Sequence, residues 1–283
     1  MEQHAGIDVS LKMSSVCILD TSGKIVRETK VASEPEALIA FFKGLSVPVT
    51  RIGLEAGPLS QWLHAELLRA GFEAVLLETR HVKAALSAMS AKTDRNDARG
   101  IAQLMRMGWF RAVHAKSVGS REVRALLVAR KQLLSKLMDL EASMRGILRG
   151  FGLKMGVVTR KGFEARVREL SAGQAMLERI TNAMLDARAA LWREFEQLHR
   201  EMLRIVRDDE ICRRLMSIPG VGPLVAVTFK SAIDNPGSSS RNRSARYSDW
   251  SPRNTNLARG ILAAALLEPE TNQYAQRYMK RPT

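Results

Sequence analysis

The chain has 283 residues, enough for one large domain or two smaller ones. Hydrophobic residues make up 46% of the sequence and charged residues 26%, a mixture that excludes an intrinsically disordered chain. The 44 Lys and Arg residues outnumber the 29 Asp and Glu residues, which gives a formal net charge of +15. A chain this basic repels its own copies and attracts polyanions, of which nucleic acid is the commonest.

The same sequence argues against several other classes of protein. No run approaches the ~18 consecutive apolar residues of a membrane-spanning helix, and the N-terminal residues do not resemble a signal peptide. Cys17 and Cys212 are the only cysteines, too few for a disulfide framework, so a reducing, cytoplasmic location is expected. The five histidines are scattered without the spacing of zinc ligands.

The first hundred residues alternate between strand-like and helix-like patterns. Strands are predicted over 5–10, 14–20, 24–31, 49–56 and 72–78, and helices over 34–45, over 59–70 and after residue 78. The turn Thr21-Ser22-Gly23 predicts a hairpin between the second and third strands. Antiparallel strands followed by βαβ units predict an α/β fold, in which helices cover a mixed sheet.

The segment from about 113 to 213 has a helical pattern instead. Apolar residues alternate at spacings of four and three in two stripes, Leu133, Leu137, Leu140, Met144 and Ile147, and then Leu191, Phe195, Leu198, Met202 and Ile205. A glycine-containing connection over 150–173 separates the stripes. Two long amphipathic helices are therefore predicted. They either fold back and bury their stripes within the chain or pair with a second subunit as a coiled coil.

The segment 216–229, MSIPGVGPLVAVTF, has glycines just before an apolar helical run. This pattern is typical of a helix-hairpin-helix-like element, in which backbone N–H groups near Gly220 and Gly222 face a nucleic-acid phosphate. A plain turn between two helices is the alternative. Beyond Pro236 the chain is rich in Ser, Arg and Asn and has little apolar periodicity, so a poorly ordered tail is predicted over 237–283.

Four acidic residues form a pattern that points to chemistry. Asp8 lies within the first apolar strand, where an acid is unfavourable unless a cation or a hydrogen-bond donor meets it. Glu55 ends the fourth predicted strand, and Asp94 and Asp97 are three residues apart on one helix face. Four converging carboxylates repel one another unless divalent cations such as Mg²⁺ lie between them. Two such ions ~3.5–4 Å apart support phosphoryl transfer.

Three of these acids also have a structural alternative. Glu55 could be a solvated strand end, and Asp94 could cap its helix. Asp97 could pair with Arg95 or Arg99. The joint pattern of the four acids favours the catalytic interpretation over these separate ones.

Four motifs carry a resemblance to a known family. GIDVS at 6–10, GLEAGP at 53–58 and KTDRNDARGIAQL at 92–104 resemble motifs of the DEDD-type insertion-sequence transposases, the IS110 family. SIPGVGP at 217–223 resembles the opening of that family's C-terminal transposase domain. The KTDRNDA motif is highly specific, whereas sugar kinases and other RNase-H-like proteins share GIDVS. The resemblance covers the chain to about residue 235.

The resemblance implies a RuvC-like (RNase-H-like) domain over 1–112, a helical coiled-coil linker over 113–213 and the start of a C-terminal transposase domain over 214–236. The catalytic, Mg²⁺-binding residues of the first domain would be Asp8, Glu55, Asp94 and Asp97. Cleavage and rejoining of double-stranded DNA, assembly as a homo-oligomer and a structured guide RNA encoded by the element are also implied.

Nucleic-acid contacts are expected at Lys92, Arg95, Arg99, Gly220 and Gly222. Aromatic residues make up only 5% of the chain, so contact with backbone phosphates is expected rather than stacking on bases. For any single Lys or Arg on a helix, a solvated surface position is the alternative.

The tail departs from the family pattern. The family's later motifs, which end in a Q-S-G segment that holds a nucleophilic serine, are not readable after Pro236. The sequence there resembles the product of a one-nucleotide shift of reading frame, so no nucleophilic serine is assigned. A complete strand exchange is accordingly not expected of the chain as written.

Three functions remain in competition. The first is a transposase, the second a RuvC-like junction nuclease that needs only the four acids, and the third an inactive remnant that only binds nucleic acid. A sugar-kinase-like ATPase is disfavoured because no Gly-rich phosphate-binding loop follows the first hairpin.

Overall fold

A computed structural model describes residues 2–87 and 93–234 of the chain. They divide into two compact units with the boundary between Lys116 and Ser117, slightly beyond the predicted boundary at residue 112. Lys92 and the predicted tail over 237–283 lie outside the described residues. Within the described ranges, no helix is long and apolar enough to cross a membrane.

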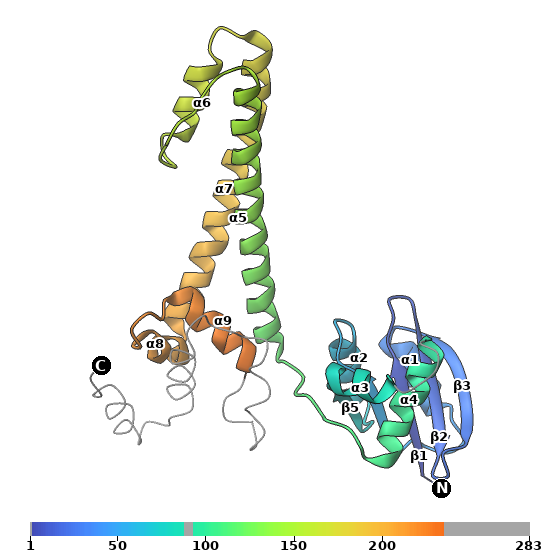
Figure 1. Ribbon diagram of the computed structural model, residues 1–283. Helices are drawn as coiled ribbons and strands as arrows, with labels where there is room; N and C mark the ends of the chain where they lie inside the picture. Colours follow the sequence, from blue (N-terminus) through green and yellow to red (C-terminus); the bar gives the residue numbers. More distant parts are fainter. Residues whose placement is uncertain (1, 88–92, 235–283) are drawn as a thin grey trace. The chain divides into compact units, whose positions relative to one another are not determined.

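The first unit is built on a five-stranded mixed sheet with the strand order β3-β2-β1-β4-β5 (Figure 1). The strands are β1 (Gln3–Asp8), β2 (Met13–Asp20), β3 (Ile25–Ala32), β4 (Arg51–Glu55) and β5 (Ala74–Leu77). β1, β2 and β3 are antiparallel neighbours, whereas β4 pairs in parallel with β1 and with β5. The predicted mixed sheet and its hairpin are confirmed.

Helices cover both faces of this sheet. The four helices are α1 (Pro35–Lys43), α2 (Ser60–Arg69), α3 (Thr79–Leu86) and α4 (Asp94–Met107). α1 and α2 pack with β1, β2 and β4 into one core that includes Ile7 and Leu54. The opposite face of β2 packs against Ala98 and Ala102 of α4. A single helix is predicted after residue 78, but the structure has two, α3 and α4. The α3 segment is polar and buries only Val82.

Two glycines let α4 lie directly on the sheet. A Cβ atom on Gly6 of β1 would stand 2.3 Å from the Ala98 carbonyl oxygen and from the Ala102 nitrogen. A Cβ atom on Gly53 of β4 would stand 2.5 Å from Cγ of Met105. Real Cβ atoms do not approach other atoms so closely. The glycine of GIDVS and the first glycine of GLEAGP therefore serve the packing of α4.

The second unit begins with a helical hairpin. α5 (Val118–Gly150) and α7 (Ala175–Asp208) lie side by side, joined through α6 (Phe163–Ser171) (Figure 1). Arg130 Nε donates to His199 Nδ1 at 3.1 Å, and Arg188 Nε to Glu141 Oε1 at 2.7 Å, a pairing that fixes the helices as antiparallel. Both predicted stripes face inward, with Leu137, Met144, Phe195 and Met202 buried. Of the two alternatives for these stripes, the folded-back one is present within the chain.

Two shorter helices pack against the end of the hairpin where α7 finishes. α8 (Glu210–Met216) and α9 (Pro223–Ile233) pack with the end of α7 into a core that contains Met202 and Phe229. The turn between them contains Gly220 with φ +84°, a left-handed conformation that favours glycine. The Asp234 carboxylate accepts a hydrogen bond from the Ser117 nitrogen at 2.7 Å and so ties the end of α9 to the start of α5.

Candidate active site

Two of the four predicted acids lie at neighbouring strand ends. Ile7 of β1 pairs with Leu54 of β4, so the next residues, Asp8 and Glu55, are adjacent across the parallel pair. Side chains alternate along a strand. Because Gly6 and Gly53 face α4, the carboxylates two residues later face the same side. Both acids are half-buried.

The direction of α4 brings the other two acids toward that end of the sheet. Arg106, in the last turn of α4, donates to the Thr21 carbonyl at 3.1 Å in the turn between β2 and β3. That turn lies at the end of the sheet where β1 begins, since Gln3 pairs with Asp20. α4 therefore runs opposite to β1. Its first turn, with Asp94 and Asp97, is directed toward the end where β1 and β4 finish.

The local structure of this first turn rules out a helix-capping role for Asp94. Thr93 is the N-cap of α4, and its hydroxyl accepts a hydrogen bond from the Asn96 nitrogen at 3.2 Å. Asp94 is thus the first residue of the helix and does not cap it. Asp94 is exposed and Asp97 is half-buried, and both lie where the helix dipole favours negative charge.

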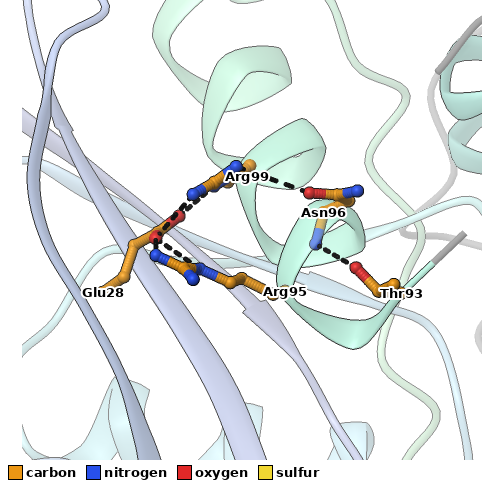
Figure 2. A network of polar contacts seen from close by, with 5 residues as sticks. All are labelled: Glu28, Thr93, Arg95, Asn96 and Arg99. Atoms are coloured by element: carbon orange, nitrogen blue, oxygen red, sulfur yellow. Dashed lines mark hydrogen bonds and ion pairs between the residues drawn. The ribbon is translucent and has the colours of Figure 1, made fainter. Parts of the chain in front are cut away.

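The two arginines that could have paired with Asp97 bind another carboxylate. Arg95 Nε donates to Glu28 Oε2 at 2.6 Å, and Arg99 donates through Nε and Nη2 to both oxygens of Glu28 (Figure 2). Hydrogen bonds from Arg99 and Arg95 lower the pKa of the Glu28 carboxyl to about 2, so this group is ionised at any ordinary pH. Burial, together with the nearby Glu28 charge, raises the pKa of the Cys17 thiol to about 12 and keeps it protonated.

The buried hydroxyl of Ser15, beside Asp8, is available to hydrogen-bond to a water or a ligand. Ser15 of β2 pairs directly with Asp8 across the antiparallel pair, so both side chains point to the same face. The Ser15 hydroxyl is buried, and among the described residues it has no hydrogen-bond partner. A buried polar atom without a partner is unfavourable unless water or a ligand meets it. Together with hard carboxylate oxygens, such a hydroxyl suits a hydrated divalent cation.

The residues present therefore fit a divalent cation in their chemistry and in their place on the sheet. Within the described ranges, however, no three His, Cys, Asp or Glu side chains already lie together as a preformed metal-ligand group. The convergence of Asp8, Glu55, Asp94 and Asp97 on shared divalent ions stays a prediction.

The predicted nucleic-acid contacts are distributed over both units. Arg95 and Arg99 are in α4 and are engaged by Glu28, while Lys92 is outside the described residues. Gly220 and Gly222 lie in the turn between α8 and α9, where the Val221 nitrogen donates to the Ile218 carbonyl. Contact of these residues with phosphates stays a prediction.

Comparison with known proteins identifies the family. A model of the DEDD-type transposases of the IS110 family matches residues 5–152, which include both strand ends and all of α4. The chain belongs to this family of insertion-sequence transposases.

Three curated relatives are similar over most of the chain. The transposase for insertion sequence element IS1111A of Coxiella burnetii is 26% identical over 235 residues, which are 81% of this chain and 62% of the relative. The putative transposase y4pF/y4sB of Sinorhizobium fredii is 27% identical over 70% of this chain and 51% of its own length. The probable family 20 transposase of Pseudomonas aeruginosa is 25% identical over 78% of this chain and 65% of its own. The chain thus spans between about half and two thirds of these relatives.

Among solved structures, Thermus thermophilus RuvC aligns with 39% of this chain and 99% of its own chain. The sequence identity is 14% and the TM-score is 0.31.

Proposed function

We propose that the first unit binds DNA and cleaves its strands by phosphoryl transfer that depends on divalent metal ions, and that rejoining of the strands needs, in addition, the family's C-terminal motifs, which are not readable after Pro236. The observation that carries this proposal is the placement of acids on three elements toward one end of the sheet. Two acids end adjacent strands, and two more occupy the first turn of the helix packed on those strands. Membership of a transposase family supports the same conclusion.

In this mechanism the carboxylates hold and orient the reacting groups. Asp8 and Glu55 are fixed by the sheet, whereas Asp94 and Asp97 come from the helix and complete the set of oxygen ligands. When bound, Mg²⁺ ions supply activation of the attacking oxygen and stabilisation of the leaving oxygen. The Ser15 hydroxyl would donate a hydrogen bond to a water or an oxygen at Asp8, which satisfies its buried polar atom.

The partners proposed for the chain are double-stranded DNA, a structured guide RNA and further copies of itself. The net charge of +15 supports binding to a polyanion. The antiparallel pairing of α5 and α7 buries the inner stripes within one chain. Dimerisation would therefore use other residues of the hairpin, such as Val128 and Met138, whose side chains are exposed.

Two alternatives remain and predict different products. A junction nuclease would cleave branched DNA without any element-specific DNA or RNA. An inactive remnant would bind nucleic acid without cleaving it, and the sequence beyond Pro236 is the feature that favours this alternative.

The decisive experiment incubates the full chain with Mg²⁺ or Mn²⁺ and each of three substrates: DNA carrying the element's ends with its RNA, a four-way junction, and linear duplex. Cleavage of the element ends alone supports the proposal. Cleavage of the junction alone supports the junction nuclease, and binding without cleavage supports the remnant. A second chain whose tail is restored from the alternative reading frame tests whether rejoining needs the family's C-terminal motifs.

The surplus of basic residues predicts strong salt dependence of DNA binding. The affinity should fall by at least about tenfold between 50 and 200 mM salt, since each phosphate contact releases condensed counterions. Titration of labelled duplex at several salt concentrations measures the slope. A dissociation constant that does not change with salt would contradict electrostatic binding through phosphates.

A further inference from the structure

We propose that Glu28, Arg95 and Arg99 form a clamp that fixes the first turn of α4, and that the three act as positioning residues for Asp94 and Asp97. The inference rests on the metal-binding function proposed above for those two acids. It also assigns Arg95 and Arg99 a role other than the phosphate contact expected from the sequence.

The contacts of the clamp are numerous and well buried at their centre. The side chain of Glu28, on β3, is 10% exposed. Arg99 binds both carboxylate oxygens of Glu28, and Arg95 adds a second guanidinium on Oε2 (Figure 2). Cys17, on β2, lies directly opposite Glu28 across the antiparallel pair. A single carboxylate of the sheet thus holds two successive turns of α4.

The order of residues in the motif divides α4 into two flanks. Arg95 and Arg99 are four residues apart and share the flank that faces β3. Asp94 and Asp97 are three apart and share a different flank. The same two turns therefore direct the two arginines toward β3 and carry the two carboxylates on a different flank of the helix. Any rotation of the helix about its axis that releases the arginines also displaces the carboxylates.

The remaining contacts of α4 explain why such a clamp is needed. At its centre the helix meets β1 through Gly6, Ala98 and Ala102, which allow a close approach but offer no long side chains to resist rotation. On the flank toward β4, Ile101 and Met105 pack over Gly53. The clamp holds the opposite flank, so the two sides together set the rotation of the helix.

Glu28 offsets one of the two positive charges of the clamp and engages both arginines. One carboxylate binds two guanidiniums, and the bidentate geometry of Arg99 matches a carboxylate as it would a phosphate. For Arg99 to bind a phosphate through the same bidentate edge, it would have to leave Glu28, whose carboxylate would then keep only Arg95.

The test compares Glu28→Gln with Glu73→Gln. The control removes a carboxylate that also binds an arginine but lies just before β5, away from Asp8 and Glu55: Glu73 Oε1 is 2.7 Å from Nε of Arg51, the first residue of β4. In the full chain, well below the melting temperature, Mn²⁺ affinity is measured from the paramagnetic resonance of the free ion. Hydrogen exchange is followed at the Asn96 and Asp97 amides, which bond to Thr93 in the first turn.

The clamp predicts that Glu28→Gln weakens Mn²⁺ binding about tenfold and speeds exchange at both amides, while Glu73→Gln changes neither by more than about twofold. A folded Glu28→Gln chain with unchanged Mn²⁺ affinity would overturn the clamp as a positioning device. If the wild-type chain binds no Mn²⁺, the proposed metal function fails. Exchange at the two amides then reports separately whether Glu28 holds the helix.

Variants of Arg99 separate positioning from DNA contact. Arg99→Gln should weaken Mn²⁺ binding by no more than Glu28→Gln, which also removes the Arg95 pair, and the double variant should lose no more than Glu28→Gln alone. Arg99→Lys keeps the charge but not the bidentate geometry, so its Mn²⁺ affinity should be intermediate. The salt slope of DNA binding should be the same for Arg99→Gln and the wild type. A slope reduced by about one would identify Arg99 as a phosphate contact and overturn the assignment.

Discussion

Replacing Asp8 by asparagine is expected to lower the rate of metal-dependent strand cleavage roughly a thousandfold or more. Asn keeps the shape of the side chain but removes the charge that binds divalent ions at the end of β1. Loss of several kcal/mol of transition-state stabilisation corresponds to a factor of this size. The measurement is single-turnover cleavage of element-end DNA by the full chain in Mg²⁺ and in Mn²⁺.

Asp20→Asn is the matched control for this variant. Asp20 ends β2, the strand that pairs with β1, but it lies opposite Gln3, at the other end of the sheet from Asp8. Its carboxylate accepts hydrogen bonds from Ser22 and Lys24. The control should cleave within about threefold of the wild type, and DNA affinity should be similar in both variants. Equal cleavage by Asp8→Asn and the wild type would remove Asp8 from the catalytic set.

Gly6→Ala is expected to destabilise the first unit by about 3 kcal/mol or more. The added Cβ atom would stand 2.3 Å from backbone atoms of α4, which cannot move aside as a flexible side chain could. Either the unit loses stability or α4 is pushed off the sheet. The midpoint and slope of urea unfolding measure the first outcome, and the reaction rate of the Cys17 thiol in a Cys212→Ala background measures the second.

Gly146→Ala in α5 serves as the comparison, and its expected change in stability has the opposite sign. Gly146 lies inside a helix, and a Cβ atom there would meet nothing within 4 Å. Alanine should stabilise this helix by up to about 1 kcal/mol, because glycine is a poor helix former. If Gly6→Ala were tolerated as well as Gly146→Ala, the close packing of α4 on β1 would be wrong.

Much of the fold could be predicted because local patterns and packing agree. The strand-like runs and the turn before Lys24 predict the hairpin, and the apolar stripes with their seven-residue repeat predict α5 and α7. The boundary between α3 and α4 could not be predicted, since the α3 segment is polar and buries only Val82. Likewise, the stripes cannot distinguish pairing within a chain from pairing between chains.

The candidate site was predictable in its acids but not in what surrounds them. Asp8 and Glu55 are recognisable because each lies at an apolar strand where an acid is unusual. Glu28 gives no such signal, since β3 is a partly exposed edge strand in which charged residues are ordinary. Only the register of β3 with β2, which sets Glu28 opposite Cys17, and the packing of α4 bring it to the arginines. Ser15 is likewise significant only because it pairs with Asp8.

The most direct test of the metal-dependent site is the anomalous scattering of Mn²⁺ in crystals of the full chain with DNA. Mn²⁺ is expected at the carboxylate ends of β1 and β4, with ligands from Asp8 and Glu55 and from at least one acid of the first turn of α4. A fully occupied ion elsewhere on the chain, with the Asp8 and Asp97 carboxylates more than ~10 Å apart, would contradict a shared two-metal site.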